Sequence, residues 1–221
     1  MSLSHSPKII TNELVLALDA ANPKSYPGSG TTWTDLSSNQ LNATLSNGPT
    51  YSSLNKGYIS FDGSNDFASI VDNSLLNPSQ SMTTSAWVYI NSFVVNASIF
   101  GKGSGSGGYD FRIDNSTQIN LVKYNVIDQR ITISSLSTGT WYNICAVQGS
   151  TSVVYYINGV NVGSFSNSSA FASQTSEFRI ARNRDTVYSN IRIGQILFYN
   201  SQLSATQVLQ NFNALRGRYA I

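Results

Sequence analysis

The sequence predicts an all-β protein: a two-sheet antiparallel sandwich with one short C-terminal helix. Three observations support this. About a dozen short apolar segments alternate with period two, turn-rich segments separate them, and Ser, Asn and Thr supply most of the polarity. At 221 residues, the chain can form one large all-β domain. Because no linker or internal repeat divides it, we expect a single domain over residues 13–221, preceded by an N-terminal arm over residues 1–12.

The strands are expected in chain order, each bounded by turn residues. The first covers 13–20 and is followed by a long connection over 22–40, where Pro and Gly disfavour regular structure. Asn158-Gly159 predicts a type I′ hairpin turn between two of the later strands. The other strands are predicted at 57–63, 66–71, 83–91, 109–114, 119–124, 130–134, 141–147, 152–157, 160–165, 177–182 and 191–200. Alternation within them predicts a core that includes Val15, Phe61, Trp87, Val88, Trp141, Ile157 and Phe198.

One helix is predicted, over residues 204–216. Ser204 is its N-cap, and Gln207 three residues later completes a capping box. Gly217 follows as a C-terminal stop. The apolar face of the helix, expected to pack on the sandwich, comprises Val208, Phe212 and Leu215.

A glycine run at residues 101–108 matches the G-x-G-x-x-G spacing of dinucleotide-binding loops through Gly103, Gly105 and Gly108. That motif requires a helix after the glycines, so that the helix N-terminus can hold phosphate. Here the glycines lead into a segment of strand periodicity, 109–114. The run is therefore interpreted as a hairpin loop, and nucleotide binding is rejected.

Composition excludes several other classes. Only 11% of the residues are charged and the net charge is +2, so the chain has no basic surface for nucleic acid. No apolar run approaches the roughly 18 residues that span a membrane. Cys145 and His5 are the sole residues of their types, which excludes a disulfide framework and a multi-cysteine zinc site. The start of the chain lacks a secretory-signal pattern, so we expect synthesis and assembly inside a cell.

Several segments together resemble the concanavalin A-like, laminin-G-like jelly-roll family. The resemblance covers nearly the whole chain, from about residue 14 to 219, and includes F-D-G-x-N-D at 61–66, Y-x-N-G at 156–159 and the closing L-S-A-x-x-V-L-Q-N-F-N-A-L at 203–215. It is closest to the branch common among tailed-phage virion proteins. The resemblance implies two facing antiparallel sheets with variable loops at the rim.

Catalysis is not expected. Glucanases of this fold share a strand bearing E-x-D-x-x-E, and neither Glu13 nor Glu177 has such neighbours. Asp110 and Asp114 fall on one face of a strand with Arg112 between them. Because Arg112 is expected to hold both carboxylates ionised, no general acid remains.

Two kinds of binding site are candidates. Some members of the resembled family hold Ca²⁺ at the sandwich rim, and Asp62, Asn65 and Asp66 form the matching cluster at a tight turn. The alternative is that Asp62 and Asn65 shape the turn by bonding their own backbone. No other cofactor is implied. The second candidate is a glycan site formed by the exposed loop residue Trp33 with Asp110 and Arg112.

The resemblance favours a non-enzymatic virion structural protein, a capsid decoration or other particle-surface component assembled in the host cytoplasm. Its partners would be other capsid or tail proteins. The alternative is a carbohydrate-binding host-recognition module that contacts a cell-surface glycan. In the arm, Lys8–Ile10 has the β-propensity to pair with a neighbour's strand edge, or else begins the first strand of its own sandwich.

Overall fold

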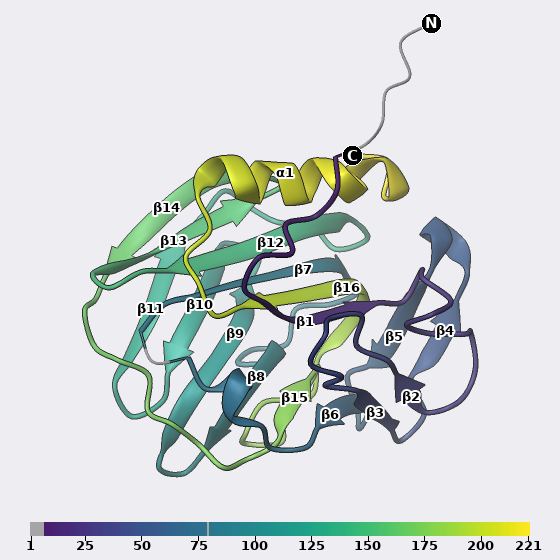
Figure 1. Ribbon diagram of the computed structural model, residues 1–221, viewed down its shortest axis with the longest axis horizontal. Coiled ribbons are helices and arrows are strands. Elements are labelled where there is room, and N and C mark those ends of the chain that lie inside the picture. The colour runs from purple at the N-terminus through teal and green to yellow at the C-terminus, as the bar shows by residue number, and fades with distance from the viewer. Residues whose placement is uncertain (1–6, 79) are drawn as a thin grey trace, which may run out of the picture.

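The computed structural model describes residues 7–78 and 80–221, and over these residues the protein is an antiparallel sandwich of two eight-stranded sheets with one α-helix (Figure 1). The predicted fold class is confirmed. Sheet A has the order β14 (Val160–Ser166), β13 (Ser152–Ile157), β12 (Trp141–Gln148), β7 (Met82–Ile90), β16 (Asn190–Tyr199), β5 (Tyr58–Asp62) and β4 (Thr50–Ser52), and β1 (Leu14–Asp19) pairs with the second half of β16. Sheet B has the order β11 (Ile127–Thr132), β10 (Gln118–Lys123), β9 (Gly107–Asn115), β8 (Ser98–Ser104), β15 (Phe178–Ile180), β6 (Phe67–Ile70), β3 (Ala43–Ser46) and β2 (Thr32–Trp33).

The core lies between the two sheets, and period-two alternation assigns each strand residue to the core or to an outer face. In sheet B, Phe111 and Leu121 are fully buried in this core, whereas the alternate positions, such as Arg112, lie on the outer face. The predicted core residues are buried except Ile157, which is only partly buried at the end of β13. Asn158 and Gly159 have φ angles of 50° and 76°, consistent with the predicted type I′ turn.

Four strands lie outside the predicted ranges: β2, β3, β4 and β8. Strand β2 forms inside the connection expected to be irregular, where Trp33 pairs with Ala43 of β3. Strand β8 includes Gly101 and Gly103, which the sequence analysis placed in a loop. The glycine run does form a hairpin, but its turn is confined to Gly105-Ser106, between β8 and β9.

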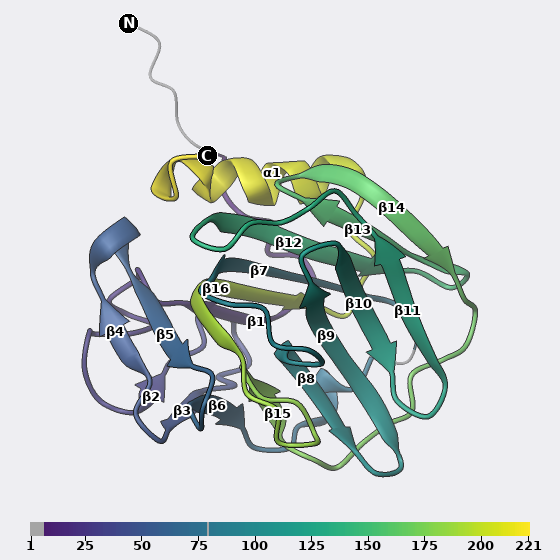
Figure 2. The same ribbon diagram turned by 180° about the vertical axis from the view of Figure 1, so that it is seen from behind.

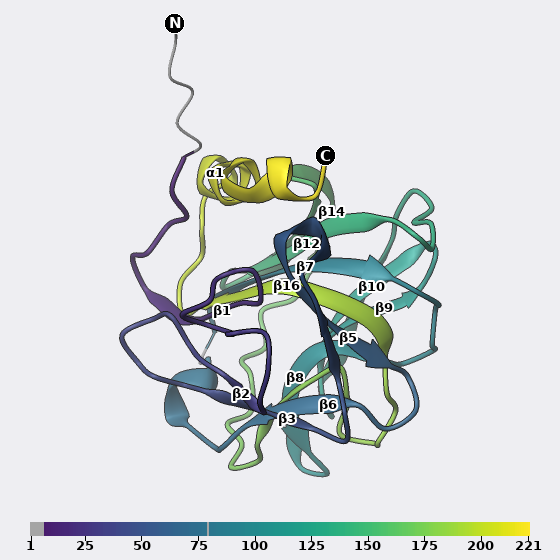
Figure 3. The ribbon, with the colours of Figure 1, turned by 90° about the vertical axis from the view of Figure 1, so that its right-hand side faces the viewer.

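Helix α1 (Ala205–Leu215) covers the outer face of sheet A (Figure 3). Its capping box is present as predicted, with Ser204 and Gln207 bonded reciprocally. Val208 and Phe212 are buried and Leu215 is partly buried. Gly217 does not adopt the left-handed conformation that would end the helix. The chain continues instead as a 3₁₀ turn over Arg216–Arg218.

That turn inserts Tyr219 under the helix, into an aromatic cluster on sheet A. The Tyr219 ring stacks on Trp87 at 4.2 Å between centroids and lies 4.6 Å from Trp141. Gly194 of β16 makes the space, because a Cβ at this position would lie 2.0 Å from the Tyr219 hydroxyl. Trp87 and Trp141 are thus buried as predicted, but beneath the helix rather than between the sheets.

The described part of the N-terminal segment contacts its own domain. The Ile10 amide donates to Asn211 Oδ1 of α1 at 2.8 Å, and the Ile10 carbonyl accepts from the Tyr199 hydroxyl at 2.8 Å. Ile9 and Ile10 pack against the cluster under α1 without forming a strand. The boundary at residue 12 stays a prediction, and residues 1–6 lie outside the described part. No helix of the described chain has the length and apolar character to cross a membrane.

Candidate functional site

A row of three side chains crosses the outer face of sheet B. Val122 of β10 lies opposite Asp110 of β9 on one side and opposite Asp128 of β11 on the other. Directly opposite residues of antiparallel strands point to the same face. Because the alternate residues of these strands fill the core, the row faces outward, and Val122 at its centre lies at the floor of the candidate site.

Asp110 is the centre of a buried hydrogen-bonded cluster. Arg112 Nε donates to Asp110 Oδ2 at 2.6 Å, and Arg112 Nη2 donates to the Tyr124 hydroxyl at 2.9 Å. The Tyr124 hydroxyl in turn donates to Asp110 Oδ2 at 2.8 Å, while the Ser98 hydroxyl donates to Asp110 Oδ1. The four side chains hold one another in place, so the cluster is a rigid base for the site.

Burial and the ion pair with Arg112 act in opposite directions on the Asp110 carboxyl. Burial raises the pKa of the Asp110 carboxyl to about 6, although the charge of Arg112 and the hydrogen bonds from Ser98, Arg112 and Tyr124 oppose this rise. A pKa of about 6 still leaves this carboxyl mainly ionised at neutral pH, which agrees with the expectation for Asp110. Asp114 pairs with a different arginine, because its Oδ2 accepts from Arg130 Nε at 2.7 Å.

The loop that joins β15 to β16 forms one wall. Asn183 shapes it: its Oδ1 accepts from the backbone amides of Asp185 and Val187 at 2.8 and 2.9 Å, and its Nδ2 donates to the Asn96 carbonyl at 3.0 Å. The next residue, Arg184, lies with its guanidinium carbon 3.8 Å from the centre of the Tyr124 ring. This cation–π contact ties the wall to the floor.

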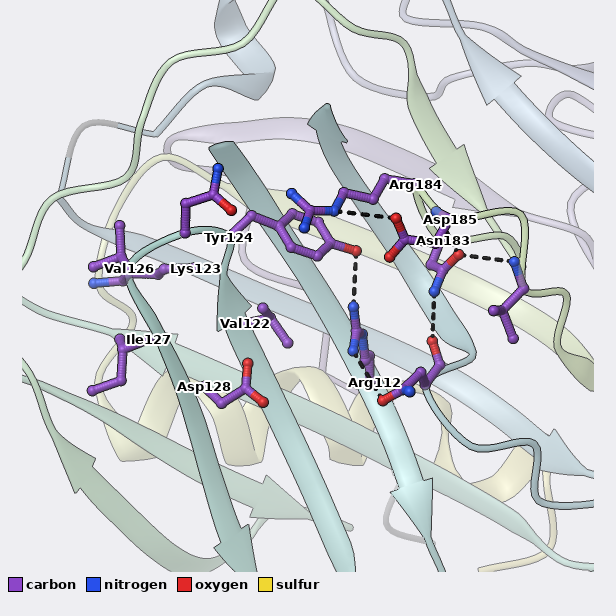
Figure 4. A pocket seen from close by; sticks show the side chains of 13 residues that line it. Arg112, Val122, Lys123, Tyr124, Val126, Ile127, Asp128, Asn183, Arg184 and Asp185 are labelled. Atoms are coloured by element: carbon purple, nitrogen blue, oxygen red, sulfur yellow. Dashed lines mark hydrogen bonds and ion pairs between the residues drawn. The ribbon is translucent and has the colours of Figure 1, made fainter. Parts of the chain in front are cut away.

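Floor and walls enclose a pocket of about 480 Å³ (Figure 4). Arg112 and Val122 lie at its base, with Tyr124 and Arg184 stacked along one side. The turn at residues 124–128 faces the loop at 183–187 across it. The volume falls in the range of small-molecule sites, and the lining combines apolar side chains with a few polar groups.

Two glycines of β8 allow side chains from neighbouring strands to lie across it. A Cβ on Gly101 would lie 2.4 Å from Asp110 Oδ1, and a Cβ on Gly103 would lie 2.6 Å from the Tyr124 ring. Gly101 and Gly103, both within the glycine run, thus serve close packing at the edge of the pocket.

Replacing Gly103 with alanine is expected to destabilise the protein by about 1–3 kcal/mol, because the added methyl overlaps the Tyr124 ring. Gly105→Ala is the matched control, since nothing lies within 4 Å of a Cβ there. Urea denaturation measures both. Equal stability of the two variants would contradict the packing role of Gly103.

The glycan residues predicted from the sequence divide between two places. Arg112 lines the pocket, and Asp110 lies buried beside it, bonded to its guanidinium. Trp33, expected as an exposed platform, is fully buried in the core between the sheets. It cannot contact a ligand, because β2 folds this part of the connection onto sheet B.

The predicted calcium residues lie at the β5–β6 turn. Asp62 Oδ1 accepts from the backbone amides of Ser64 and Asn65 at 2.8 and 3.3 Å, and Asp66 Oδ2 accepts from the Asp62 amide at 3.2 Å. The hydrogen bond from the Ser64 amide is the main cause that lowers the pKa of Asp62, whereas burial raises that of Asp66. No group of three or more His, Cys, Asp or Glu side chains suited to a metal ion occurs in the described residues. The hydrogen bonds agree with the turn-shaping alternative, and a calcium titration decides between the two.

Calorimetric titration with millimolar Ca²⁺ is expected to show no heat, because backbone amides already occupy carboxylate oxygens that a metal would need. An Asp62→Asn variant titrated in parallel separates site binding from surface effects. A saturable heat that this variant abolishes would establish the calcium site.

Sequence reasoning missed several pocket residues: Asn96, Tyr124, Asn183 and Arg184. Three of them lie in connections or a rim loop, where side-chain direction has no periodic signal. Tyr124 was predicted as the last residue of the strand at 119–124, and the alternate glycines Gly101 and Gly103 were the available sign that a bulky side chain approaches β8.

A family model described as the concanavalin A-like lectin/glucanases superfamily matches residues 62–209, more than half of the chain. The chain belongs to the concanavalin A-like lectin/glucanase superfamily. The match spans strands of both sheets, the whole pocket and the start of α1. No curated protein sequence matches this superfamily member.

Solved structures resemble this concanavalin A-like domain at the level of the fold. The binding domain of Paraclostridial Mosquitocidal Protein 1 has a TM-score of 0.74 at 16% identity, over 92% of this chain and 52% of that one. The binding domain of botulinum neurotoxin DC, in complex with SialylT, has a TM-score of 0.73 at 14% identity, over 93% and 52% of the two chains. Domain 4 of AbnA, an extracellular arabinanase of Geobacillus stearothermophilus, in complex with arabinotriose, has a TM-score of 0.71 at 16% identity, over 90% and 98%. The chain thus spans about half the length of the two toxin domains and nearly all of the arabinanase domain.

Proposed function

We propose that the protein is a non-enzymatic carbohydrate-binding domain and that the pocket on sheet B is its binding site. The observation that carries the proposal is the pocket itself, in which an apolar floor at Val122 lies between hydrogen-bonding side chains on two walls. Similarity to domains solved with arabinotriose and with SialylT supports the ligand class.

The state of the carboxylates supports binding over catalysis. Asp110 is 1% exposed and accepts hydrogen bonds from three side chains, so a substrate would have to displace these partners to reach it. Asp128 Oδ2 accepts from Arg130 Nη2 at 3.2 Å. Neither carboxyl is placed as a free proton donor for glycoside cleavage.

A glycan array followed by calorimetry tests the proposal. Val122→Phe fills the floor of the pocket and is expected to abolish binding of whichever glycan the wild type retains. Val160→Phe, at an exposed position of β14, is the matched control and should bind normally. Asp128→Ala serves as a second pocket variant, because the Asp128 side chain is 52% exposed and its removal should change stability little. Wild-type protein that binds no glycan, or unchanged binding by both pocket variants, would exclude this function.

We further propose that the domain acts on the surface of a virus particle, made in the host cytoplasm and contacting other virion proteins. The motifs at 61–66, 156–159 and 203–215, which resemble tailed-phage virion proteins, support this setting. Mass spectrometry of purified particles tests it: hundreds of copies per particle indicate decoration of the capsid, and a dozen or fewer indicate a tail component. A chain that is absent from the particles would overturn it.

A further inference from the structure

The negatively and positively charged side chains of the pocket differ in how exposed they are. Its carboxylates at the rim are accessible: the side chains of Asp128 and Asp185 are 52% and 63% exposed. Its guanidinium groups are withdrawn, since the side chains of Arg112 and Arg184 are only 7% and 22% exposed. Each rim carboxylate is more exposed than the arginine paired with it, Arg130 for Asp128 and Arg184 for Asp185. A ligand entering the pocket therefore meets a carboxylate on each wall before it meets Arg112 or Arg184.

The lysine of the lining does not alter this balance. Lys123 contributes to the pocket from β10, but its ammonium lies 4.5 Å from the centre of the Phe171 ring and donates to Asn167 Oδ1 at 3.1 Å. Phe171 belongs to the core cluster between the sheets. The positive charge of Lys123 is thus directed away from the pocket.

The polar donors of the pocket are largely occupied by the protein itself. Arg112 donates to Asp110, Asn96 and Tyr124, and Arg184 Nη1 donates to the Ser104 carbonyl at 2.8 Å. The side-chain amides of Asn183 and Asn125 also donate to backbone carbonyls.

The groups that remain for a ligand are mainly acceptors: the second carboxylate oxygens of Asp128 and Asp185, whose first oxygens lie 3.2 Å from Arg130 and 3.5 Å from Arg184, and the side-chain carbonyl of Asn125. A fitting ligand must bring donors, such as hydroxyl groups, and no negative charge. The apolar side chains of Val122, Val126, Ile127 and Val187 offer contact to the C–H face of a sugar ring.

We propose that the pocket selects uncharged saccharides and rejects glycans that carry a carboxylate or sulfate at the bound residue. This inference rests on the proposed carbohydrate-binding function and names its ligand class. Rejection arises because an anionic group would be placed between Asp128 and Asp185, with the buried arginines already paired or stacked.

Matched glycan pairs on an array test the selection, each pair consisting of a neutral oligosaccharide and the same chain ending in sialic or uronic acid. In low salt, the wild type is expected to bind the neutral member at least tenfold more tightly. The ratio should shrink in high salt, because the rim charges are screened. The double variant Asp128→Asn/Asp185→Asn should bring the ratio close to one, whereas Glu13→Gln, an exposed carboxylate outside the pocket, should leave it unchanged.

The outcomes separate the two proposals. Equal or tighter binding of the acidic members overturns neutral selection while leaving carbohydrate binding intact. A ratio that persists in the double variant also overturns it, because the rim carboxylates would not be the cause. Absence of binding to every glycan overturns the carbohydrate function and this inference with it.

Discussion

Replacing Arg112 with methionine is expected to destabilise the protein by about 3–5 kcal/mol near pH 8, the usual cost of leaving one member of a buried ion pair without its partner. In this variant Asp110 would lose the guanidinium group that lies 2.6 Å from it in the wild type. Burial already raises the pKa of Asp110 to about 6 in the intact pair. Without Arg112 the pKa of Asp110 rises further.

The pH dependence of the Arg112→Met variant follows from this shift. A carboxyl whose folded pKa exceeds its unfolded pKa stabilises the protein most below the unfolded value, and that contribution is lost as pH rises through the folded value. The deficit of the variant is therefore expected to narrow as the pH falls from 8 through about 6. Urea denaturation at several pH values measures it.

Two further variants control for the loss of a large side chain. Arg216→Met removes an exposed arginine and should change stability by less than about 0.5 kcal/mol. The double variant Asp110→Asn/Arg112→Met leaves no charge at the cluster and should recover much of the lost stability. A single variant as stable as the wild type at pH 8 would show that the pair is not closely coupled to folding.

Deleting residues 204–221 is expected to prevent stable folding, because it exposes the outer face of sheet A. The segment buries Val208, Phe212 and Tyr219, and each buried side chain of this size contributes on the order of 1.5–3 kcal/mol. Trp87 and Trp141 would also lose their cover. Circular dichroism and thermal melting measure the outcome.

A point variant keeps this prediction quantitative if the truncated chain aggregates. Tyr219→Ala should cost about 3–5 kcal/mol through the cavity between Trp87 and Trp141. Tyr219→Phe is the matched control and should change stability little, since the buried hydroxyl has no hydrogen-bond partner in the described structure. A melting temperature unaffected by Tyr219→Ala would contradict the role of the cluster.

The fold was predictable because most strands alternate strongly and the helix has a complete capping box. The failures occurred where local pattern and tertiary contact disagree. Gly101 and Gly103 have low β-propensity, yet β8 forms because it pairs with β9 and β15, and the missing side chains are compensated by Tyr124 and Asp110 lying across the strand. Tertiary packing overrides propensity at such positions.

The site was only half predictable for a related reason. Asp110 and Arg112 stand on one strand face, so their proximity follows from period two. Asn183 and Arg184 reach the same pocket from a loop more than 70 positions later, and no local signal relates them to β9. Trp33 shows the converse: a Trp in a Pro- and Gly-rich stretch suggests exposure, but β2 places it in the core.

The position of the chain's last residues relative to the pocket determines where a tether can be attached without covering the pocket. The C-terminal end at Ile221 lies beside α1 on the outer side of sheet A (Figure 2). The pocket is lined by residues on the outer side of sheet B. The thickness of both sheets separates the two. A tether or an affinity tag joined after Ile221 would therefore orient the pocket toward solvent, so immobilised protein presents its binding face without steric cost. Attachment through the Asn183–Val187 loop would do the opposite and block the entrance.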